Sequence, residues 1–288
     1  MPGSRSYLVG LMIFSEDIHY YYSALQAGVM RAARRHGYHM IMELMKGYES
    51  EDRHAVLRRL GSSRFDAMVV PPPMCDDPVI LDMLETLRIP YIRIAPRLQL
   101  ERSSYIYMND SQAAYEVMEH LWNLGHRQIL YVGFRETGAS LDRYDGYTRF
   151  FRDKGQVPPF PLIEVGNATP KGAIATGETI MMSDNRPTAI FAGSDMIAFG
   201  LMTAAAKSGL SVPGDISVVG FDDSPGAESV WPPLTTIQQP IVDMGESAVD
   251  NIVKALGGDL AVKAKAAHIL DFSLIIRGST APPRQPDA

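Results

Sequence analysis

The chain has 288 residues, of which 46% are hydrophobic and 21% charged, and its formal net charge is -6. This length suits two lobes better than one core, and the acidic balance argues against a nucleic-acid-binding surface. The single cysteine, Cys75, excludes an internal disulfide framework and a cysteine-rich metal site. We identify neither a signal peptide nor an apolar run long enough to span a bilayer, so we expect a cytoplasmic protein without a membrane partner.

Strand-like and helix-like runs alternate along nearly the whole chain, which predicts an α/β protein with doubly wound parallel sheets. Strands are predicted at residues 7–14, 40–44, 67–70, 91–94, 105–108, 128–132, 162–165, 189–192, 216–221 and 268–276. Helices are predicted at residues 21–36, 51–60, 79–87, 112–124, 144–154, 173–182, 196–206 and 241–256. We expect Gly37, Gly61 and Gly209 to stop helices, and Asn109 or Asp110 to cap the helix that follows them.

The most informative stretch is a strand-helix-strand unit in the second half of the chain. Its first apolar run, 189–192, ends in Gly193, Ser194 and Asp195, and its second, 216–221, ends in Asp222 and Asp223. Ligands of open parallel sheets bind outside the carboxyl ends of the strands. The unit therefore predicts where a ligand site lies, although it contains no obvious catalytic group.

Three features near predicted strand ends could contact a ligand. Arg143, at the start of a predicted helix, offers a fork of donors that suits a hydroxyl-rich or anionic ligand, but a solvated arginine is the simpler interpretation. Asp222 and Asp223 could form a metal pair, act as a general base, accept hydrogen bonds or cap a turn and a helix, and the residues alone favour the cap. The tyrosine-rich segment 15–22 could stack on a ligand or pack on the next helix.

Signatures of enzymes are not found. The chain lacks a G-x-G-x-x-G after its first strand, a P-loop, a nucleophile elbow and an H-E-x-x-H motif. His36 and His39 flank a helix stop, which is poor geometry for two ligands of one metal. Cys75 lies beside Asp76 and Asp77, and these acids should raise the pKa of its thiol. We therefore predict that the protein is not an enzyme and has no metal site and no cofactor.

The predicted helix 196–206 is apolar almost all round, so it must be buried on more than one side. Its own sheet could supply all of this burial, or the sheet and a partner subunit could share it. We favour the partner subunit. This interpretation makes four side chains of the helix candidates for a homodimer interface: Met196, Ile197, Phe199 and Met202.

A series of short motifs follows along nearly the whole chain. They are VGLMIF at 9–14, RRHGY at 34–38, FDAMVV at 65–70, RIPYIRI at 88–94, HLWNLGHRQILYVG at 120–133, RYDGY at 143–147, PTAIFAGSD at 187–195, VPGDISVVGFDD at 212–223, PPLTTIQQP at 232–240 and RGST at 277–280. Each motif is weakly specific, but the full set in this order resembles the effector-binding core of the LacI/GalR family of bacterial transcription regulators. That core has the periplasmic-binding-protein type I fold.

The resemblance implies two lobes joined by three crossings. The first lobe would comprise residues 1–124 and 241–267, and the second 125–239 and 268–280, followed by a disordered tail at 281–288. A small polar effector, most suitably a sugar or a sugar derivative, would bind between the lobes. A ligand that contacts both lobes favours their closed form, and closure in a dimer would carry the signal.

The resemblance also implies roles for individual side chains. By position, Tyr21 and Tyr22 match an aromatic pair at the ligand site. Phe14, at the end of the first strand, is a further candidate for effector binding. Arg143 matches an arginine that grips the effector, and Asp222 matches an acid that accepts hydrogen bonds from ligand hydroxyls. One further position, Ser194, occupies a place often held by asparagine.

Two departures from the family pattern affect the prediction. The N-terminal helix-turn-helix of the family is missing from this sequence, so we expect contact with operator DNA only through that missing domain. The segment 166–169 offers no aromatic side chain, which argues against a flat ligand clamped on both faces. A solute-binding receptor for a sugar transporter is the alternative function; it would share the fold but would need an export signal and would normally be monomeric.

Overall fold

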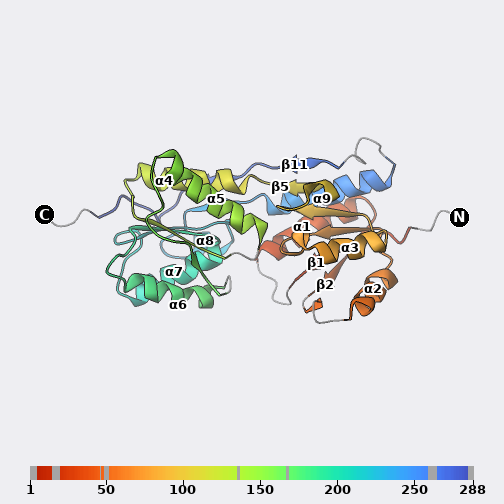
Figure 1. The fold of residues 1–288 in the computed structure, drawn as a ribbon, viewed down its shortest axis with the longest axis horizontal. Coiled ribbons are helices and arrows are strands. Elements are labelled where there is room, and N and C mark those ends of the chain that lie inside the picture. The colour runs from red at the N-terminus through yellow and green to blue at the C-terminus, as the bar shows by residue number, and fades with distance from the viewer. Residues whose placement is uncertain are drawn as a thin grey trace. The chain divides into compact units, whose positions relative to one another are not determined.

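The structure, a computed structural model, describes residues 5–14, 20–45, 47–48, 52–134, 137–166, 169–258 and 265–284. Its internal contacts divide the chain into two units. Unit 1 comprises Met1–Met108 and Pro240–Leu270, and unit 2 comprises Asn109–Gln239 and Asp271–Ala288. The chain passes between the units three times, as predicted. Figure 1 shows both units as a ribbon and labels many of their elements with the names used below.

Unit 1 contains a sheet of parallel strands in the order β11-β5-β4-β3-β1-β2. Its middle strand β3 is buried at every position, as expected for a strand covered on both faces. The strands are β1 (Leu8–Ile13), β2 (His39–Leu44), β3 (Ala67–Val70), β4 (Tyr91–Ile94), β5 (Tyr105–Tyr107) and β11 (Ala267–Ile269). The helices are α1 (Tyr20–Arg35), α2 (Arg53–Ser62), α3 (Pro78–Thr86) and α9 (Ile241–Leu256), with short 3-10 turns η2 (Met74–Asp76) and η3 (Leu100–Arg102).

Helices α1 and α9 pack against each other through two glycines. A Cβ atom at Gly28 would collide with the carbonyl oxygen of Val242, and one at Gly245 would lie 2.6 Å from that of Leu25. The two helix backbones therefore approach more closely than side chains would allow. This contact joins α9, which lies far along the sequence, to the first helix of the unit.

We expect Gly28→Ala to lower the free energy of unfolding by about 1–2 kcal/mol, because the added methyl group would push two backbones apart. Gly61→Ala is the matched control: Gly61 lies near the end of α2, where a Cβ would only approach the flexible side chain of Leu87 at 3.3 Å. Alanine favours helices, so this control should be neutral or slightly stabilising. Urea denaturation of both variants measures the difference, and equal stabilities would contradict the close contact.

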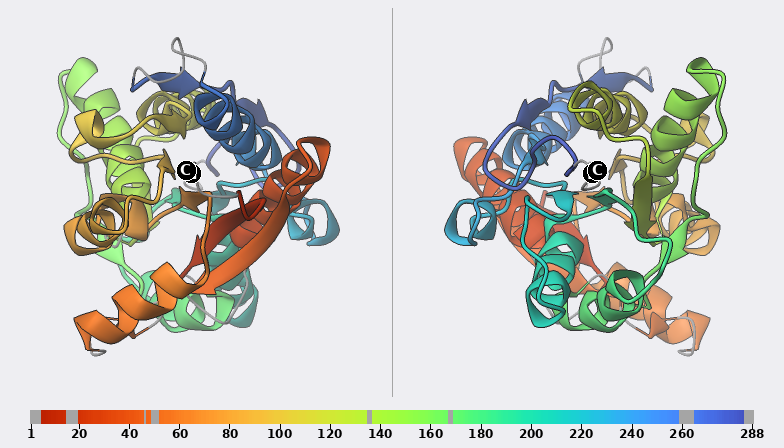
Figure 2. Two further views of the ribbon diagram at one scale, coloured as in Figure 1. Left: turned by 90° about the vertical axis from the view of Figure 1, so that its right-hand side faces the viewer. Right: turned by 90° about the vertical axis from the view of Figure 1, so that its left-hand side faces the viewer.

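Unit 2 contains a parallel sheet in the order β7-β6-β8-β9 and a separate antiparallel pair, β10 and β12. Helices α6 and α7 lie side by side, as both views of Figure 2 show. The strands are β6 (Ile129–Gly133), β7 (Ile163–Glu164), β8 (Ala189–Ala192), β9 (Ser217–Val219), β10 (Thr236–Gln238) and β12 (Ser273–Ile275). The helices are α4 (Asp110–Asn123), α5 (Gly138–Asp153), α6 (Pro170–Met181), α7 (Asp195–Lys207) and the short α8 (Gly226–Ser229).

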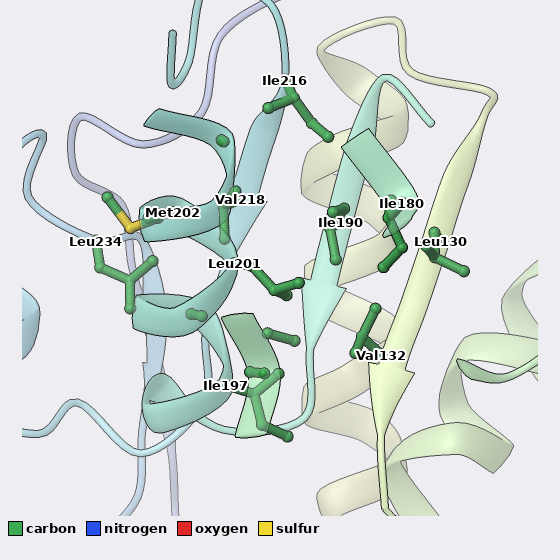
Figure 3. Packing of buried hydrophobic residues seen from close by; sticks show 14 of the residues in the cluster. Leu130, Val132, Ile180, Ile190, Ile197, Leu201, Met202, Ile216, Val218 and Leu234 are labelled. Atoms are coloured by element: carbon green, nitrogen blue, oxygen red, sulfur yellow. The ribbon is translucent and has the colours of Figure 1, made fainter. Parts of the chain in front are cut away.

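Much of the apolar surface of α7 is covered by unit 2 itself. Figure 3 shows Ile197, Leu201 and Met202 of this helix among apolar side chains of neighbouring strands and helices. Ile197 is fully buried and Met202 is 8% exposed. The prediction that these two side chains face a partner subunit is therefore wrong, because they lie inside the core of their own unit. Met196 and Phe199 are only partly buried, and their place in an interface stays a prediction.

The boundaries of the two units differ from the predicted lobes. Helix α4 belongs to unit 2 rather than unit 1, since its contacts are mainly with α5. The predicted strand 268–276 is two short strands, β11 in unit 1 and β12 in unit 2, and the chain crosses between them. Residues 281–284 of the predicted disordered tail pack on unit 2: the carbonyl oxygen of Ala281 lies 2.8 Å from His126 Nε2. The rest of that tail lies outside the described residues.

Local differences from the predicted elements are few. Gly37 and Gly209 follow helix ends with positive φ angles, as predicted, but α2 continues through Gly61. Asn109 caps α4 by accepting a hydrogen bond from the backbone N of Gln112 at 3.0 Å. Strand β10 lies in the proline-rich stretch 232–240 and helix α8 lies just before it, and we predicted neither element. Among the described residues, no helix is long and apolar enough to cross a membrane.

Candidate functional site

The candidate site of unit 2 lies where strands β8 and β9 end. Gly193 and Ser194 follow β8, and the segment 220–223 follows β9. Gly220 has no room for a side chain, because a Cβ atom there would collide with Asp195 Oδ1 and lie 2.7 Å from Leu234 Cδ2. The two strand ends are thus packed closely enough for their polar groups to act together. This is the edge of the sheet where the sequence predicts a ligand site.

Arg143 is the central donor at this edge. It lies in the second turn of α5, not at a helix start as predicted, and it is only 6% exposed. Its Nε donates to Asp110 Oδ1 at 2.8 Å, and its Nη1 donates to the carbonyl oxygen of Gly193 at 2.7 Å. The guanidinium carbon lies 3.7 Å from the centroid of the Phe221 ring. Its Nη2 has no hydrogen-bond partner among the described residues, so that nitrogen keeps its donors for a ligand.

Asp110 is the buried counter-ion of Arg143. Burial raises the pKa of the Asp110 carboxyl, and the charge and hydrogen bond of Arg143 oppose this rise. For Arg143, burial lowers the pKa, whereas the charges of Asp110 and then Asp222 raise it, and the net direction is upward. Each member of the pair thus keeps the other charged in a place with little water. Removal of either member would leave an uncompensated buried charge.

Asp222 is the acceptor at the same edge. Its φ angle of 130° lies in a region that residues other than glycine rarely adopt. Its backbone N donates to the carbonyl oxygen of Ile237 at 2.8 Å, and Gln239 Nε2 donates to its Oδ1 at 2.6 Å. Burial raises the pKa of this carboxyl to about 7, against the opposing charge of Arg143 and with a further increase from the charge of Asp195. Within the described part of the chain, its Oδ2 has no hydrogen-bond partner.

Asp195 holds the turn that carries Asp222. This fully buried carboxylate accepts hydrogen bonds from Ser224 N at 2.7 Å, Ser224 Oγ at 2.9 Å and Thr236 Oγ1 at 2.6 Å. Its own backbone N donates to the carbonyl oxygen of Phe221 at 2.7 Å. Burial raises the pKa of the Asp195 carboxyl, and the hydrogen bonds from Thr236 and Ser224 oppose the rise. One side chain at the start of α7 therefore fixes the loop after β9 and strand β10.

The neighbouring acid, Asp223, has a different role. Its Oδ1 accepts a hydrogen bond from Arg277 Nη2 at 2.7 Å, and its Oδ2 accepts one from Gln238 Nε2 at 2.8 Å. Arg277 also donates to the carbonyl oxygen of Leu234 at 2.9 Å. Asp223 thus ties the loop to strand β10 and to the segment that follows β12, while Asp222 keeps an unused acceptor. Among the described residues, no group of three or more histidine, cysteine or acidic side chains could hold a metal ion.

Ser194 is a helix cap in this structure. Its Oγ accepts a hydrogen bond from the backbone N of Ile197 at 3.3 Å, which satisfies one free donor at the start of α7. The side chain is 7% exposed and lies between Gly193, the acceptor of Arg143, and Asp195. Its position at the sheet edge agrees with the prediction, and a contact with an effector stays a prediction.

The aromatic candidates belong to unit 1. Tyr22 donates its hydroxyl to the carbonyl oxygen of Pro72 at 2.6 Å, and burial raises the pKa of that hydroxyl. The rings of Tyr21 and Tyr22 meet edge to face with centroids 5.8 Å apart. Phe14 packs partly buried against the core of the unit. These side chains lie near the carboxyl ends of β1 and β3. The first part of the tyrosine-rich segment, residues 15–19, lies outside the described residues. Residues 167 and 168, which belong to the segment 166–169 that offers no aromatic side chain, also lie outside them.

Cys75 is buried, and burial followed by the charge of Asp76 raises the pKa of its thiol. We expect this thiol to react with Ellman's reagent at least a thousandfold more slowly in the native protein than in guanidinium chloride, because the thiolate is the reactive form. Absorbance at the wavelength of the released product measures both rates. A Cys75→Ser variant supplies the blank, and complete reaction of the native protein on mixing would contradict this result.

Three side chains of the site were missed or given another role. Asp110 was predicted only as a possible cap, Asp195 only as part of a polar strand end, and Gln239 was not singled out. Nothing in the local sequence separates a cap from a buried counter-ion. The nearest signal was the position of Asp195 at the end of β8, since the carboxyl ends of parallel strands meet at one edge.

The fold and the site define a class: a two-unit α/β protein with parallel sheets and a polar donor-acceptor set at strand ends, as in small-molecule-binding cores. The family model described as "Periplasmic binding protein-like domain" matches residues 118–280. The transcriptional regulator DegA of Bacillus subtilis is 27% identical over 287 residues, which are 98% of this chain and 83% of DegA. The repressor PurR of Vibrio atlanticus is 28% identical over 249 residues, which are 85% of this chain and 73% of PurR.

A solved structure described as a transcriptional regulator CelR-cellobiose complex superposes with a TM-score of 0.86 at 23% identity, covering 97% of this chain and 86% of the other. The chain belongs to the periplasmic-binding-protein-like family, and it is the effector-binding core of a LacI-type regulator. The predicted family and fold class are confirmed. DegA and PurR are both described as helix-turn-helix transcriptional regulators, which favours a regulator over a transport receptor or an enzyme.

Proposed function

We propose that this chain senses a sugar or sugar derivative and that Arg143 and Asp222 bind it. The observation that carries the proposal is the pair of unused groups at one sheet edge. Arg143 is fixed by two hydrogen bonds and an aromatic face while its Nη2 stays unbonded, and Asp222 keeps its Oδ2, both among the described residues. A rigid donor beside an acidic acceptor suits the hydroxyl groups of a polyol, which donate and accept hydrogen bonds.

The acidic groups around Asp222 favour a neutral, hydroxyl-rich effector. Asp110 and Asp195 lie at the same edge, and both carry carboxylates close to that of Asp222. An anionic ligand would face three acidic groups and one arginine whose charge Asp110 already balances. A neutral ligand avoids this repulsion. Cellobiose, named in the description of the CelR structure, is a ligand of this kind.

Isothermal titration calorimetry with a panel of neutral sugars tests the proposal. We expect one sugar to bind the wild-type protein with saturation, and Asp222→Ala to weaken its binding about a hundredfold, because a hydrogen bond to a charged group contributes about 1.5–3 kcal/mol. The control variant Glu228→Gln removes an acid of unit 2 that is 77% exposed and is not part of the site. That variant should bind like the wild type, whereas equal affinity of Asp222→Ala would remove Asp222 from the site.

We further propose a cytoplasmic homodimer in which effector binding alters the state of a helix-turn-helix domain on operator DNA. The support is the relationship to DegA and PurR, both described as helix-turn-helix regulators. In this arrangement the present chain supplies the sensor, and the helix-turn-helix contacts the operator. Size-exclusion chromatography with light scattering tests the dimer, and a monomer at high concentration would contradict it.

The roles of Tyr21, Tyr22 and Phe14 are part of the same proposal. The Tyr22 hydroxyl is already bonded to Pro72, so Tyr22 would offer its ring rather than its oxygen to a sugar. Tyr22→Phe should then retain most of the affinity for the sugar. Tyr22→Ala should lose it, since stacking needs the aromatic face.

A further inference from the structure

Unit 1 contains a cavity at the amino-terminal ends of strands β4 and β5. It has a volume of about 440 Å³ and lies where α3 ends, where β4 and β5 begin, and along the last turns of α9. All of its lining residues belong to unit 1, and none is a candidate effector residue. A volume of this size lies within the range of small-molecule sites.

Apolar side chains make up part of the lining. Ile89 and Pro90 precede β4, and Ile252 and Ala255 come from α9. Tyr91 adds an aromatic ring, and its hydroxyl donates to Glu85 Oε1 at 2.8 Å. This part of the cavity can accommodate a flat or apolar body but offers it no charge.

The positive charge of Arg102 in the lining is already neutralised by two acids. Arg102 donates through Nε to Glu85 Oε1 at 3.0 Å and through Nη2 to Asp82 Oδ1 at 2.7 Å. Its Nη1 donates to Gln99 Oε1 at 2.9 Å. Arg102 is therefore part of the wall of the cavity, and its donors are used.

Two other cations in the lining have no such partner. The side chains of Arg88 and Lys265 are exposed, and neither side chain forms an ion pair or hydrogen bond with any residue that the structure describes. Ser104 adds a hydroxyl whose oxygen accepts a hydrogen bond from the backbone N of Ala266 at 3.1 Å. The hydrogen of that hydroxyl has no acceptor in the described ranges. Two positive charges and one unused donor thus lie around an apolar surface.

We propose that this cavity binds a small organic anion, with a phosphate or carboxylate group between Arg88, Lys265 and Ser104 and an apolar body against Ile252 and Ala255. Phosphate and carboxylate are the groups that an arginine fork and an ammonium recognise best. The site is separate from the sugar site of unit 2. It would give the regulator a second ligand, different in charge from the first.

Ligand-observed NMR and calorimetry with phenyl phosphate as the probe test this inference. We expect saturable binding to the wild-type protein, and about tenfold weaker binding to the double variant Arg88→Gln, Lys265→Gln, because each exposed cation contributes a fewfold factor. Benzoate in a parallel titration distinguishes a carboxylate site from a phosphate site. Inorganic phosphate should bind at least fivefold more weakly than phenyl phosphate, since it cannot use the apolar surface.

Arg64→Gln is the matched control. Arg64, like Arg88, is an exposed arginine with a positive φ that follows a helix end, but it does not line the cavity. It should leave phenyl phosphate binding unchanged, and so should Asp222→Ala, which tests the sugar site independently. Equal loss in Arg64→Gln and in the double variant would overturn the proposal. So would equal affinity for inorganic phosphate and phenyl phosphate, or loss of binding in Asp222→Ala.

Discussion

Replacement of Arg143 by methionine should lower the free energy of unfolding by about 3–5 kcal/mol, the cost expected when one partner of a buried ion pair is lost. The variant leaves the Asp110 carboxylate, 5% exposed, without its counter-ion, and it leaves the carbonyl oxygen of Gly193 without its donor. Guanidinium denaturation followed by circular dichroism measures the change. A loss below 1 kcal/mol would contradict the ion pair.

The double variant Arg143→Met, Asp110→Leu separates the charge from the packing. It removes both ions and places apolar groups of similar volume in their stead, so it should recover much of the stability that Arg143→Met loses. Sugar binding should not recover, because the donor Nη2 is still missing. Recovery of both properties would show that Arg143 does not contact the effector.

Asp222→Asn should stabilise the protein at pH 8 by about 2 kcal/mol and have little effect at pH 4. The pKa of Asp222 is about 7 in the folded chain and 3.8 in a model peptide. A folded-state pKa above the unfolded value means that the folded state holds its proton more tightly, so stability falls as pH rises from about 4 to about 7. The expected gain of about 2 kcal/mol is smaller than the free energy that the whole pKa difference would give, because the Asp222 side chain is partly exposed and solvent screens its charge.

The difference in unfolding free energy between wild type and Asp222→Asn isolates this effect from Asp110 and Asp195, whose pKa values burial also raises. Denaturation curves at half-unit pH intervals from 4 to 8 give the profile. If the difference in unfolding free energy between the two proteins does not change with pH over this range, the pKa of Asp222 is not raised. Affinity for the sugar should rise over the same interval in the wild type, since the ionised carboxylate is the stronger acceptor.

The arrangement of acids around Arg143 lowers the stability of unit 2 but leaves groups available for a ligand. Besides the Asp223–Arg277 pair, unit 2 holds the carboxylates of Asp110, Asp195 and Asp222 close to Arg143, and among the described residues only Asp110 forms a direct ion pair with that arginine. Asp195 accepts three hydrogen bonds and fixes the turn, which leaves Asp222 with a positive φ and a raised pKa. Backbone strain and a disfavoured charge are common at binding sites, where a ligand supplies the missing partner.

Much of the fold could be predicted from the amino-acid sequence. Buried parallel strands are short apolar runs, and amphipathic helices between them end at glycine or begin at a capping residue, so periodicity locates both. The segment 189–192 became β8 and Asn109 became a cap for this reason. The same local signals placed Ser194 and Asp222 directly after strand ends, where a ligand site of a parallel sheet is expected. Strand β10 was missed because prolines surround it and it pairs with β12, which lies far along the chain.

By itself, the sequence determined the strand-helix rhythm, the family and the edge of the sheet that carries the candidate site, because all three depend on local patterns and their order. The tertiary structure decided which polar side chains are bonded within the protein and which are available to a ligand. Only packing showed that Asp110 pairs with Arg143 and that Asp195 holds the turn. It also showed that Ile197 lies in the core of its own unit and not at a surface. Burial and long-range pairing depend on residues distant in sequence, and no local pattern records them.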